Sequence, residues 1–434
     1  MKKSTLIALA AASMALIAML AGCAKKVEPQ TINVLAWDDP LPRAIKDLIP
    51  EFEKATGHKV NLELQPTTSV ITKTTVGVTK DRADYDVVAV DEGNIPIVAP
   101  VMLPFDKWPA GAVYQKVAKD TVTPAMLDAA TWDGVTVGFP INGNLYVWMT
   151  RKDLIENPAY RSDFKAAYGY DLRVPETFKE MLEMGSFFNE RGIATGFGNF
   201  ATGSPGVHAE AIFMWESFGT KFIDRVNGKY AVVLDEAKAV EGMEFYKKLM
   251  AIAPANAATL GHSERQAAYT TGKGLFSMFI WPNQIANYEN PDSSLFAGKI
   301  AYSPPPAGPA KRAAPRGCWT LAIAAASAKQ QAAAEFVYWW ASKEIGYKLA
   351  DMNIPGARKD VLADPRYKDS KPWYAAMAAA MDYAVARPRF PQIAQVNEIV
   401  KKYWLAGVTG AMPTADAVKA IVTETNVVLI EANK

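Results

Sequence analysis

The sequence predicts an α/β fold built on parallel sheets, and three observations support this prediction. Short apolar runs of strand length alternate with segments of helical periodicity in the first part of the chain. The order strand, helix, strand, helix, strand is that of a parallel α/β sheet. The chain has 434 residues, a length at which proteins usually divide into more than one hydrophobic core. Half of its residues are hydrophobic, as is usual for a globular protein. We therefore expect two or more α/β domains.

The first elements follow from the spacing of apolar residues. Residues 31–37 (TINVLAW) form a short apolar run that is typical of a buried strand. Apolar residues at helical spacing predict a helix over 42–56, and Gly57 is a suitable C-terminal stop. Residues 58–64 alternate like a strand, and 84–91 form a third strand with acidic residues at both ends.

The later elements are predicted in the same way. An Asp-Gly turn marks a hairpin over 132–140, and a further strand is expected over 141–148. The run 303–309 holds four prolines and is expected to be a loop, whereas 317–326 resembles a strand. Helices are expected over 177–191, 207–218, 236–252, 330–342 and 372–386.

The N-terminus has the features of an export signal. Lys2 and Lys3 precede an apolar stretch from Leu6 to Leu20, and small residues follow. A transmembrane anchor is the alternative, but the apolar stretch is short of the about 20 residues that span a bilayer. We therefore expect residues 1–23 to be a signal peptide and the protein to be exported.

The ending Leu20-Ala21-Gly22-Cys23 resembles the bacterial lipobox. The resemblance implies that Cys23 carries a diacylglyceryl group, and two acyl chains hold a protein stably at a membrane. The polar stretch 24–30 is then a tether. With Cys23 lipidated, Cys318 alone remains, so no internal disulfide is expected.

Several classes of function lack support in the sequence. The net charge is +2 and no basic stripe occurs, which argues against a nucleic-acid partner. The three histidines, His58, His208 and His262, have no metal-ligand spacing, and no cofactor motif is present. Cys318 has no evident histidine partner, and there is no nucleophile elbow. We therefore expect no catalytic residues, no metal site and no cofactor.

An ordered set of motifs resembles bacterial extracellular solute-binding proteins of family 1, the maltose-binding-like group. The match extends over nearly the whole chain after the tether. Its segments are FEKATGHKV at 52–60, YDVVAVD at 85–91, TWDGVTVGFPINGN at 131–144, TRKDL at 150–154, RVPETF at 173–178 and GCWTLAI at 317–323. The chain departs from the family pattern at Thr150, Phe178 and Cys318.

The resemblance implies a two-lobe fold with a ligand cleft that closes by hinge motion. The expected lobes are 31–141 plus 302–345 and 142–301 plus 346–434. It also implies a monomer that hands its solute to the permease subunits of an ABC importer. With the lipid anchor, the expected location is the periplasm or the outer face of the plasma membrane.

The candidate ligand-binding residues combine flat aromatic rings with polar groups, as a sugar or polyol requires. Asp38, Asp91 and Glu92 follow strand ends, where ligands of α/β sheets bind, although helix capping is an alternative role for the aspartates. For Asn142 and Asn144 the alternative role is to form a turn. For Arg358 the alternative is a surface ion pair, and for Trp215 it is packing in the core. The aromatic and polar candidates are Trp37, Asp38, Asp91, Glu92, Asn142, Asn144, Trp215, Trp281, Trp319 and Arg358.

Two other readings stay open. The carboxylates at the strand ends also suit a cationic solute such as a polyamine, which aromatic rings bind as well. A lipoprotein glycosidase needs two carboxylates at a defined separation, which the sequence neither indicates nor excludes.

Overall fold

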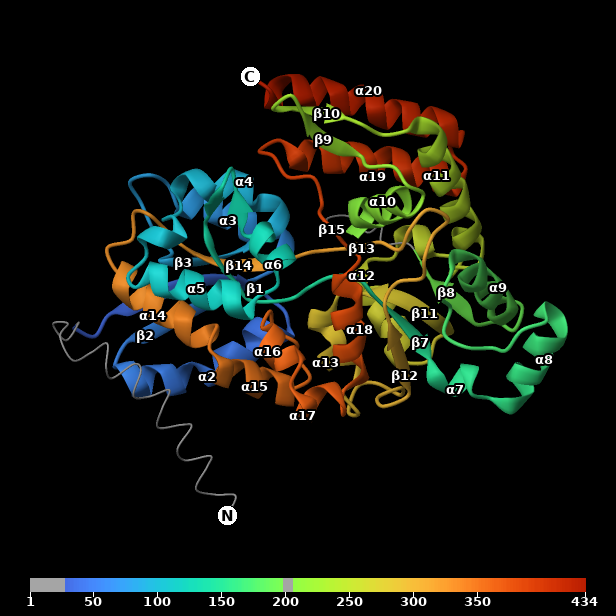
Figure 1. Ribbon diagram of the computed structural model, residues 1–434, viewed down its shortest axis with the longest axis horizontal. Coiled ribbons are helices and arrows are strands. Elements are labelled where there is room, and N and C mark those ends of the chain that lie inside the picture. The colour runs from blue at the N-terminus through green and yellow to red at the C-terminus, as the bar shows by residue number, and fades with distance from the viewer. Residues whose placement is uncertain (1–27, 198–205) are drawn as a thin grey trace, which may run out of the picture.

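A computed structural model describes residues 28–197 and 206–434. The predicted signal peptide, Cys23 and most of the predicted tether lie outside the described residues. Two sheets, each covered by helices, lie side by side in the molecule (Figure 1).

The first sheet has the order β2 (Lys59–Gln65), β1 (Thr31–Trp37), β3 (Val87–Asp91), β14 (Trp319–Ile323) and β6 (Gly138–Pro140). β1 is parallel to both β2 and β3, whereas β14 is antiparallel to β3 and β6. The central strands β1, β3 and β14 are strongly apolar, as expected of strands that helices cover, whereas β2 at the edge is more polar. Helices α2 (Pro40–Thr56) and α14 (Gln330–Trp340) lie on the same side of the molecule as this sheet, at the left of Figure 1.

We call this sheet, with the helices that contribute buried residues to its core, the first lobe. Its helices are α2 (Pro40–Thr56), α3 (Thr67–Gly77), α4 (Ile95–Val98), α5 (Gly111–Thr121), α6 (Pro124–Ala129), α14 (Gln330–Trp340) and α15 (Lys343–Asp351). A short hairpin, β4 (Thr131–Trp132) and β5 (Val135–Thr136), precedes β6.

The second sheet has the order β12 (Ile300–Ser303), β7 (Val147–Arg151), β11 (Leu275–Ile280) and β8 (Ala194–Gly196). We call it and its helices the second lobe. These helices are α7 (Lys152–Ile155), α8 (Pro158–Tyr168), α9 (Phe178–Asn189), α10 (Gly206–Ser217), α11 (Glu236–Ala251), α12 (His262–Thr270), α13 (Ile285–Tyr288), α16 (Lys359–Leu362), α17 (Pro365–Lys368), α18 (Pro372–Met381), α19 (Ile393–Thr409) and α20 (Thr414–Ala432).

The part of the second lobe built from α10, α11, α19 and α20 has its own aromatic core, and α19 and α20 lie at the top of Figure 1. The hairpin of β9 (Ile223–Val226) and β10 (Lys229–Val232) packs against α20. Among the helices of the described residues, none combines the length and the apolar character needed to cross a bilayer.

The chain passes between the sheets at 141–146, after β6, and at 304–318, between β12 and β14. Near the second passage, β13 (Ala314–Pro315) pairs with β15 (Ala384–Val385) from the C-terminal part of the chain. The assignment of 31–141 plus 302–345 and of 142–301 plus 346–434 to the two lobes stays our proposal.

The local predictions agree with most elements. Helix α2 buries Ile45, Leu48 and Phe52 on one face, and it ends at Gly57, whose φ of 79° is left-handed. Asp133 and Gly134 both have positive φ, as the predicted Asp-Gly turn requires. The strand predicted over 141–148 is wrong for its first part, because β7 begins only at Val147.

Candidate interlobe binding site

Two tryptophans meet at the carboxyl edge of the first sheet. Trp37 is the last residue of β1 and Trp319 is the first of β14, which runs antiparallel to β3. Their rings stack with centroids 4.2 Å apart and planes within 8°. The register also sets Asp91 opposite Trp319. The sheet topology therefore brings together three of the predicted residues that are far apart in sequence.

A third tryptophan reaches the same region from the second lobe. Trp281 follows β11, and its ring centroid lies 4.4 Å from that of Tyr146. A Cβ atom on Gly317 would come within 3.2 Å of the Trp281 ring. The glycine therefore lets the ring lie against the backbone just before Trp319.

Asn142 and Asn144 lie on the passage between the lobes and fix its backbone. The backbone N–H of Trp319 donates to Asn142 Oδ1 at 2.8 Å. The backbone N–H of Gly317 donates to the carbonyl oxygen of Asn144 at 2.8 Å, and that of Asn283 donates to Asn144 Oδ1 at 3.3 Å. Both asparagines are buried. They hold the Trp319 and Trp281 segments next to each other.

Arginines neutralise the carboxylates at the end of β3. Arg387 Nη2 donates to both carboxylate oxygens of Asp91, at 2.8 and 3.0 Å. Arg316 Nε donates to Glu92 Oε1 at 2.9 Å, and Glu92 is fully buried. Arg316 also donates to Asp128. Charge-assisted bonds of this kind are the strong ones in a protein interior.

Asp39 makes a direct contact between the lobes. It precedes α2 in the first lobe, and Asn283 Nδ2 of the second lobe donates to its Oδ2 at 2.8 Å. Burial raises the pKa of Asp39 to about 7, although the Asn283 hydrogen bond opposes this shift. His208, on α10, is buried as well, and burial, assisted by the charge of Arg387, lowers its pKa to about 3. His208 is therefore neutral at ordinary pH.

We call the residues joined by these contacts the interlobe cluster: Trp37, Asp39, Asp91, Glu92, Asn142, Asn144, Trp281, Asn283, Arg316, Trp319 and Arg387. Three predicted residues lie apart from this cluster. Asp38 is exposed and pairs with Arg43 at 2.6 Å. Trp215 is fully buried in the aromatic core of the second lobe. Arg358 pairs with Asp360 at 2.8 Å and donates to the carbonyl oxygen of Ala341.

Four residues of the cluster were not predicted as binding residues: Asp39, Asn283, Arg316 and Arg387. Asn283 lies two positions after Trp281, so the Trp281-Pro282-Asn283 turn is a local signal for it. The two arginines have no local signal, because their carboxylate partners are remote in sequence.

Five polar atoms of this interlobe cluster are buried yet have no hydrogen-bond partner within the described ranges. The donors are Trp37 Nε1 and Asn142 Nδ2, and the acceptors are Asp39 Oδ1, Glu92 Oε2 and Asn283 Oδ1. Buried polar atoms are normally paired, so a group of unpaired ones requires an explanation. A bound molecule with both donor and acceptor groups satisfies such a set.

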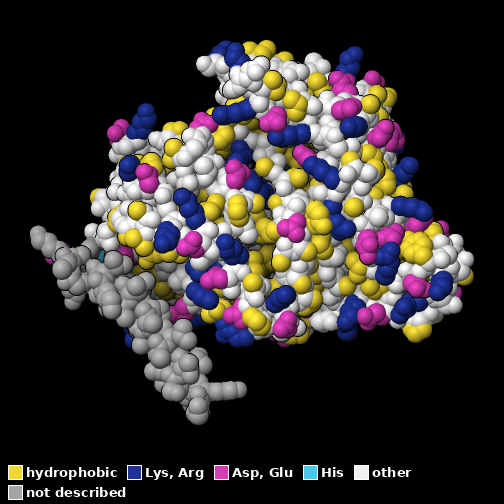
Figure 2. All heavy atoms as spheres, viewed as in Figure 1, with side chains coloured by type: hydrophobic (Ala, Val, Ile, Leu, Met, Phe, Trp, Pro, Cys, Tyr) yellow, Lys and Arg dark blue, Asp and Glu magenta, His cyan; other side chains and the backbone are white. Residues whose placement is uncertain are grey.

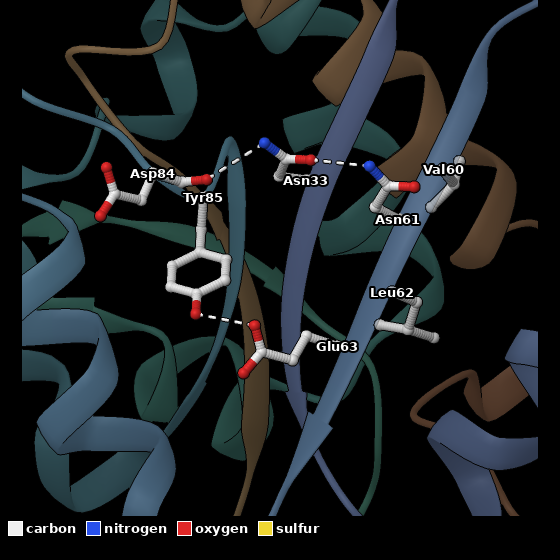
Figure 3. Close-up of a pocket in the computed structure, with 7 residues that line it drawn as sticks. All are labelled: Asn33, Val60, Asn61, Leu62, Glu63, Asp84 and Tyr85. Atoms are coloured by element: carbon white, nitrogen blue, oxygen red, sulfur yellow. Dashed lines mark hydrogen bonds between the residues drawn. The ribbon is translucent and has the colours of Figure 1, made fainter.

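A separate hollow of about 700 Å³ lies on the first lobe, near the amino ends of β1 and β2 (Figure 3). Its side chains are bonded to one another: Asn61 Nδ2 donates to Asn33 Oδ1 at 3.1 Å, and the Tyr85 hydroxyl donates to Glu63 Oε2 at 2.9 Å. Asn33 Nδ2 donates to the carbonyl oxygen of Asp84. Because it is open and internally paired, it is a weaker candidate than the interlobe cluster.

Other site chemistries find little support in the geometry. Within the described part of the chain, no group of three or more His, Cys, Asp or Glu residues is placed to hold a metal ion. Burial raises the pKa of the Cys318 thiol well above its usual range, which disfavours the reactive thiolate. On the face shown in Figure 2, cationic and anionic side chains are interspersed rather than gathered in a patch of one sign.

Comparisons with solved structures place the fold among two-lobe binding proteins. The maltose-bound MalE3 of T. maritima matches with a TM-score of 0.78 and 23% identity, over 92% of this chain and all of that one. A solute-binding protein of Agrobacterium radiobacter K84 in complex with ribitol matches with a TM-score of 0.77 and 22% identity, over 92% of this chain and 99% of that one. At these identities the likeness establishes the α/β two-lobe fold alone.

Two curated relatives match at the sequence level. A probable ABC transporter-binding protein of Deinococcus radiodurans is 26% identical over 284 residues, which are 64% of each chain. A probable amino-acid ABC transporter periplasmic-binding protein of Sinorhizobium fredii is 25% identical over 61% of this chain and 56% of its own length. This chain therefore spans less than two thirds of either relative.

The family comparison agrees with the fold. The model of the bacterial extracellular solute-binding proteins matches residues 38–347, which is more than half of the chain and includes Asp39, Asp91, Asn283 and Trp319 but not Trp37 or Arg387. This protein therefore belongs to the family of bacterial extracellular solute-binding proteins.

Proposed function

We propose that this protein captures a neutral, hydroxyl-rich solute, a sugar or a polyol, between its two lobes and delivers it to an ABC importer. The observation that carries the proposal is the group of unpaired buried donors and acceptors among Trp37, Asp39, Glu92, Asn142 and Asn283. Sugar hydroxyls both donate and accept, so they suit a mixed set. The tryptophans supply the flat apolar surfaces that sugar C–H faces contact.

The charge balance supports a neutral solute. Asp91 is paired with Arg387, and Glu92 with Arg316, so these carboxylates are already neutralised. The residues 198–205, outside the described part of the chain, include no charged side chain in the sequence. A charged solute needs an unpaired opposite charge, because burying an uncompensated ion is costly.

The relatives give this proposal limited support of their own. MalE3 is bound to maltose and the Agrobacterium protein to ribitol, and both share the fold. A cationic solute remains the second candidate, because Asp39 is one buried carboxyl without a cationic partner among the described residues.

A thermal-shift screen against maltose, ribitol, D-mannitol and spermidine tests the proposal. A ligand at about one hundred times its Kd adds about 2.7 kcal/mol to stability, which raises Tm by several degrees. We expect a sugar or polyol to raise Tm, and we expect Trp319→Ala to abolish the rise.

Trp339→Ala is the matched control, because Trp339 lies on α14 and packs against Phe52 and Phe336, away from the interlobe cluster. This variant is expected to lower Tm but to keep the shift. A rise with spermidine alone would replace the sugar proposal by the cationic one.

We also propose that the protein is exported and held at the cell envelope by a lipid on Cys23, on the basis of the Leu20-Ala21-Gly22-Cys23 motif. Cells expressing the full chain should incorporate labelled fatty acid into the protein and retain it in the membrane fraction. Cys23→Ala should abolish both. Labelling that persists in this variant would contradict the anchor.

A further inference from the structure

Asp39 occupies a helix-capping position but is used differently. It precedes α2 as its N-cap residue, yet its carboxyl makes no capping hydrogen bond. The carboxyl instead accepts a hydrogen bond from Asn283 Nδ2, at 2.8 Å. Because Asn283 follows β11, this bond joins the two lobes and exists only while they are in contact. Both residues are buried there, Asp39 to 8% exposure and Asn283 to 5%.

The carboxyl of Asp39 lacks the cation that accompanies the other buried carboxyls. Arg43, the nearest arginine in sequence, pairs with Asp38 instead. Among the residues that the structure describes, the remaining buried carboxyls all have a cationic partner: Asp86 with Lys329, Glu92 with Arg316 and Glu210 with Arg265. An ionised Asp39 in contact with a neutral amide alone would carry a large desolvation cost.

The hydrogen bonding of the pair is also incomplete without a proton. Asp39 Oδ1 and Asn283 Oδ1 are both buried acceptors with no partner in the described residues. A proton on Asp39 turns one of these acceptors into a donor, and the amide oxygen of Asn283 belongs to the side chain that Asp39 already contacts. An acid and an amide can exchange two hydrogen bonds in this way, and the pair then carries no charge.

The groups around Asp39 set the balance between its two forms. Burial favours the neutral acid and raises its pKa to about 7. The Asn283 hydrogen bond favours the anion, and so, to a smaller degree and in this order, do Trp37, the charge of Arg43 and the backbone at Leu41. Among the described residues of the second lobe, the neutral Asn283 is the group that bonds to the Asp39 carboxyl. When the lobes separate, the carboxyl returns to water, where an aspartate has a pKa of about 3.9.

We propose that Asp39 is a proton-binding site of the closed lobes, so that closure takes up a proton and acidification favours the closed arrangement before any solute binds. The sign follows from linkage: the closed form binds more protons, so its population rises as pH falls. With one proton involved, the ratio of closed to open molecules increases by up to about tenfold per pH unit between about pH 7 and pH 4. This proposal does not depend on which solute the protein binds.

Small-angle X-ray scattering of the solute-free protein tests it. The radius of gyration of the wild type should be smaller at about pH 5 than at about pH 8, because the lobes come together. Asp39→Asn, which is neutral at every pH, should remove this pH dependence. Asp38→Asn is the matched control and should keep it, because Asp38 is exposed and bonded to Arg43.

Asn283→Ala provides an independent variant in the other lobe. It should keep the pH dependence, because the Asn283 hydrogen bond favours the anion and burial still raises the pKa of Asp39 without it. A wild-type radius of gyration that does not change with pH would overturn the proposal, and so would a pH dependence that survives in Asp39→Asn. The thermal-shift screen of the wild type reports sugar binding separately, so a failure of this proposal and a failure of the sugar proposal can be distinguished.

Discussion

Replacement of Arg316 by methionine is expected to lower the free energy of unfolding by about 3–5 kcal/mol. Glu92 is fully buried, and Arg316 Nε is its hydrogen-bond donor at 2.9 Å. Without the guanidinium, Glu92 becomes a buried charge whose nearest remaining cation is Arg389, at 3.9 Å. Arg316 Nη1 also donates to the carbonyl oxygen of Ala125 at 2.6 Å, so the variant loses that bond too. Urea unfolding followed by tryptophan fluorescence measures the loss.

The matched control is Arg366→Met, because Arg366 is exposed and pairs with Asp364 near the surface. Its loss should stay below about 1 kcal/mol. Glu92→Gln introduced together with Arg316→Met should recover part of the stability, since no buried charge then remains unpaired. Equal losses in Arg316→Met and Arg366→Met would contradict the importance of this buried pair.

Trp215→Ala is expected to cost about 3–5 kcal/mol of stability while leaving the solute-induced rise in Tm intact. Trp215 is fully buried. Its ring is perpendicular to that of Trp404, with the ring centroids 5.5 Å apart, and its centroid lies 4.8 Å from that of Phe222. Removing the indole leaves a cavity among these rings. Urea unfolding gives the loss, and the same solute screen gives the shift.

Trp215→Phe should lose much less, because it keeps most of the buried aromatic surface. If Trp215→Ala instead keeps normal stability but loses the solute-induced rise in Tm, Trp215 would be a ligand contact. That result would bring back the role considered for it from the sequence alone.

The sequence was informative wherever a local pattern determines the structure. Helix α2 is amphipathic and ends at a glycine, so its position was predictable to within a few residues. The segment 141–148 was predicted as one strand that continues from the hairpin, although its first part holds Asn142, Gly143 and Asn144. The backbone of 141–146 instead bonds to remote segments: the N–H of Ile141 donates to the carbonyl oxygen of Trp319, and that of Tyr146 to the carbonyl oxygen of Pro315. No local pattern marks where the passage between the lobes ends and the strand begins.

The candidate site shows the same division. Trp37 and Asp91 were predictable as neighbours because they lie at the carboxyl ends of strands in one sheet, whereas Trp319 was proposed from the family resemblance. Arg387 was not, because its reason for being buried is Asp91, which is 296 positions away. An arginine is buried when a partner compensates its charge, and no local sequence pattern identifies a partner in a remote part of the chain.

The position of β14 in the first sheet has a consequence for how the molecule forms. β3 and β6 do not pair with each other; both pair with β14, which is separated from β6 by residues 141–318. The sheet of the first lobe therefore cannot be completed until most of the second lobe has been synthesised. At about 5–20 residues per second, this interval lasts roughly 10–35 seconds. Throughout that time the apolar edges of β3 and β6 lack their native partner, which makes the nascent first lobe slow to fold and prone to association.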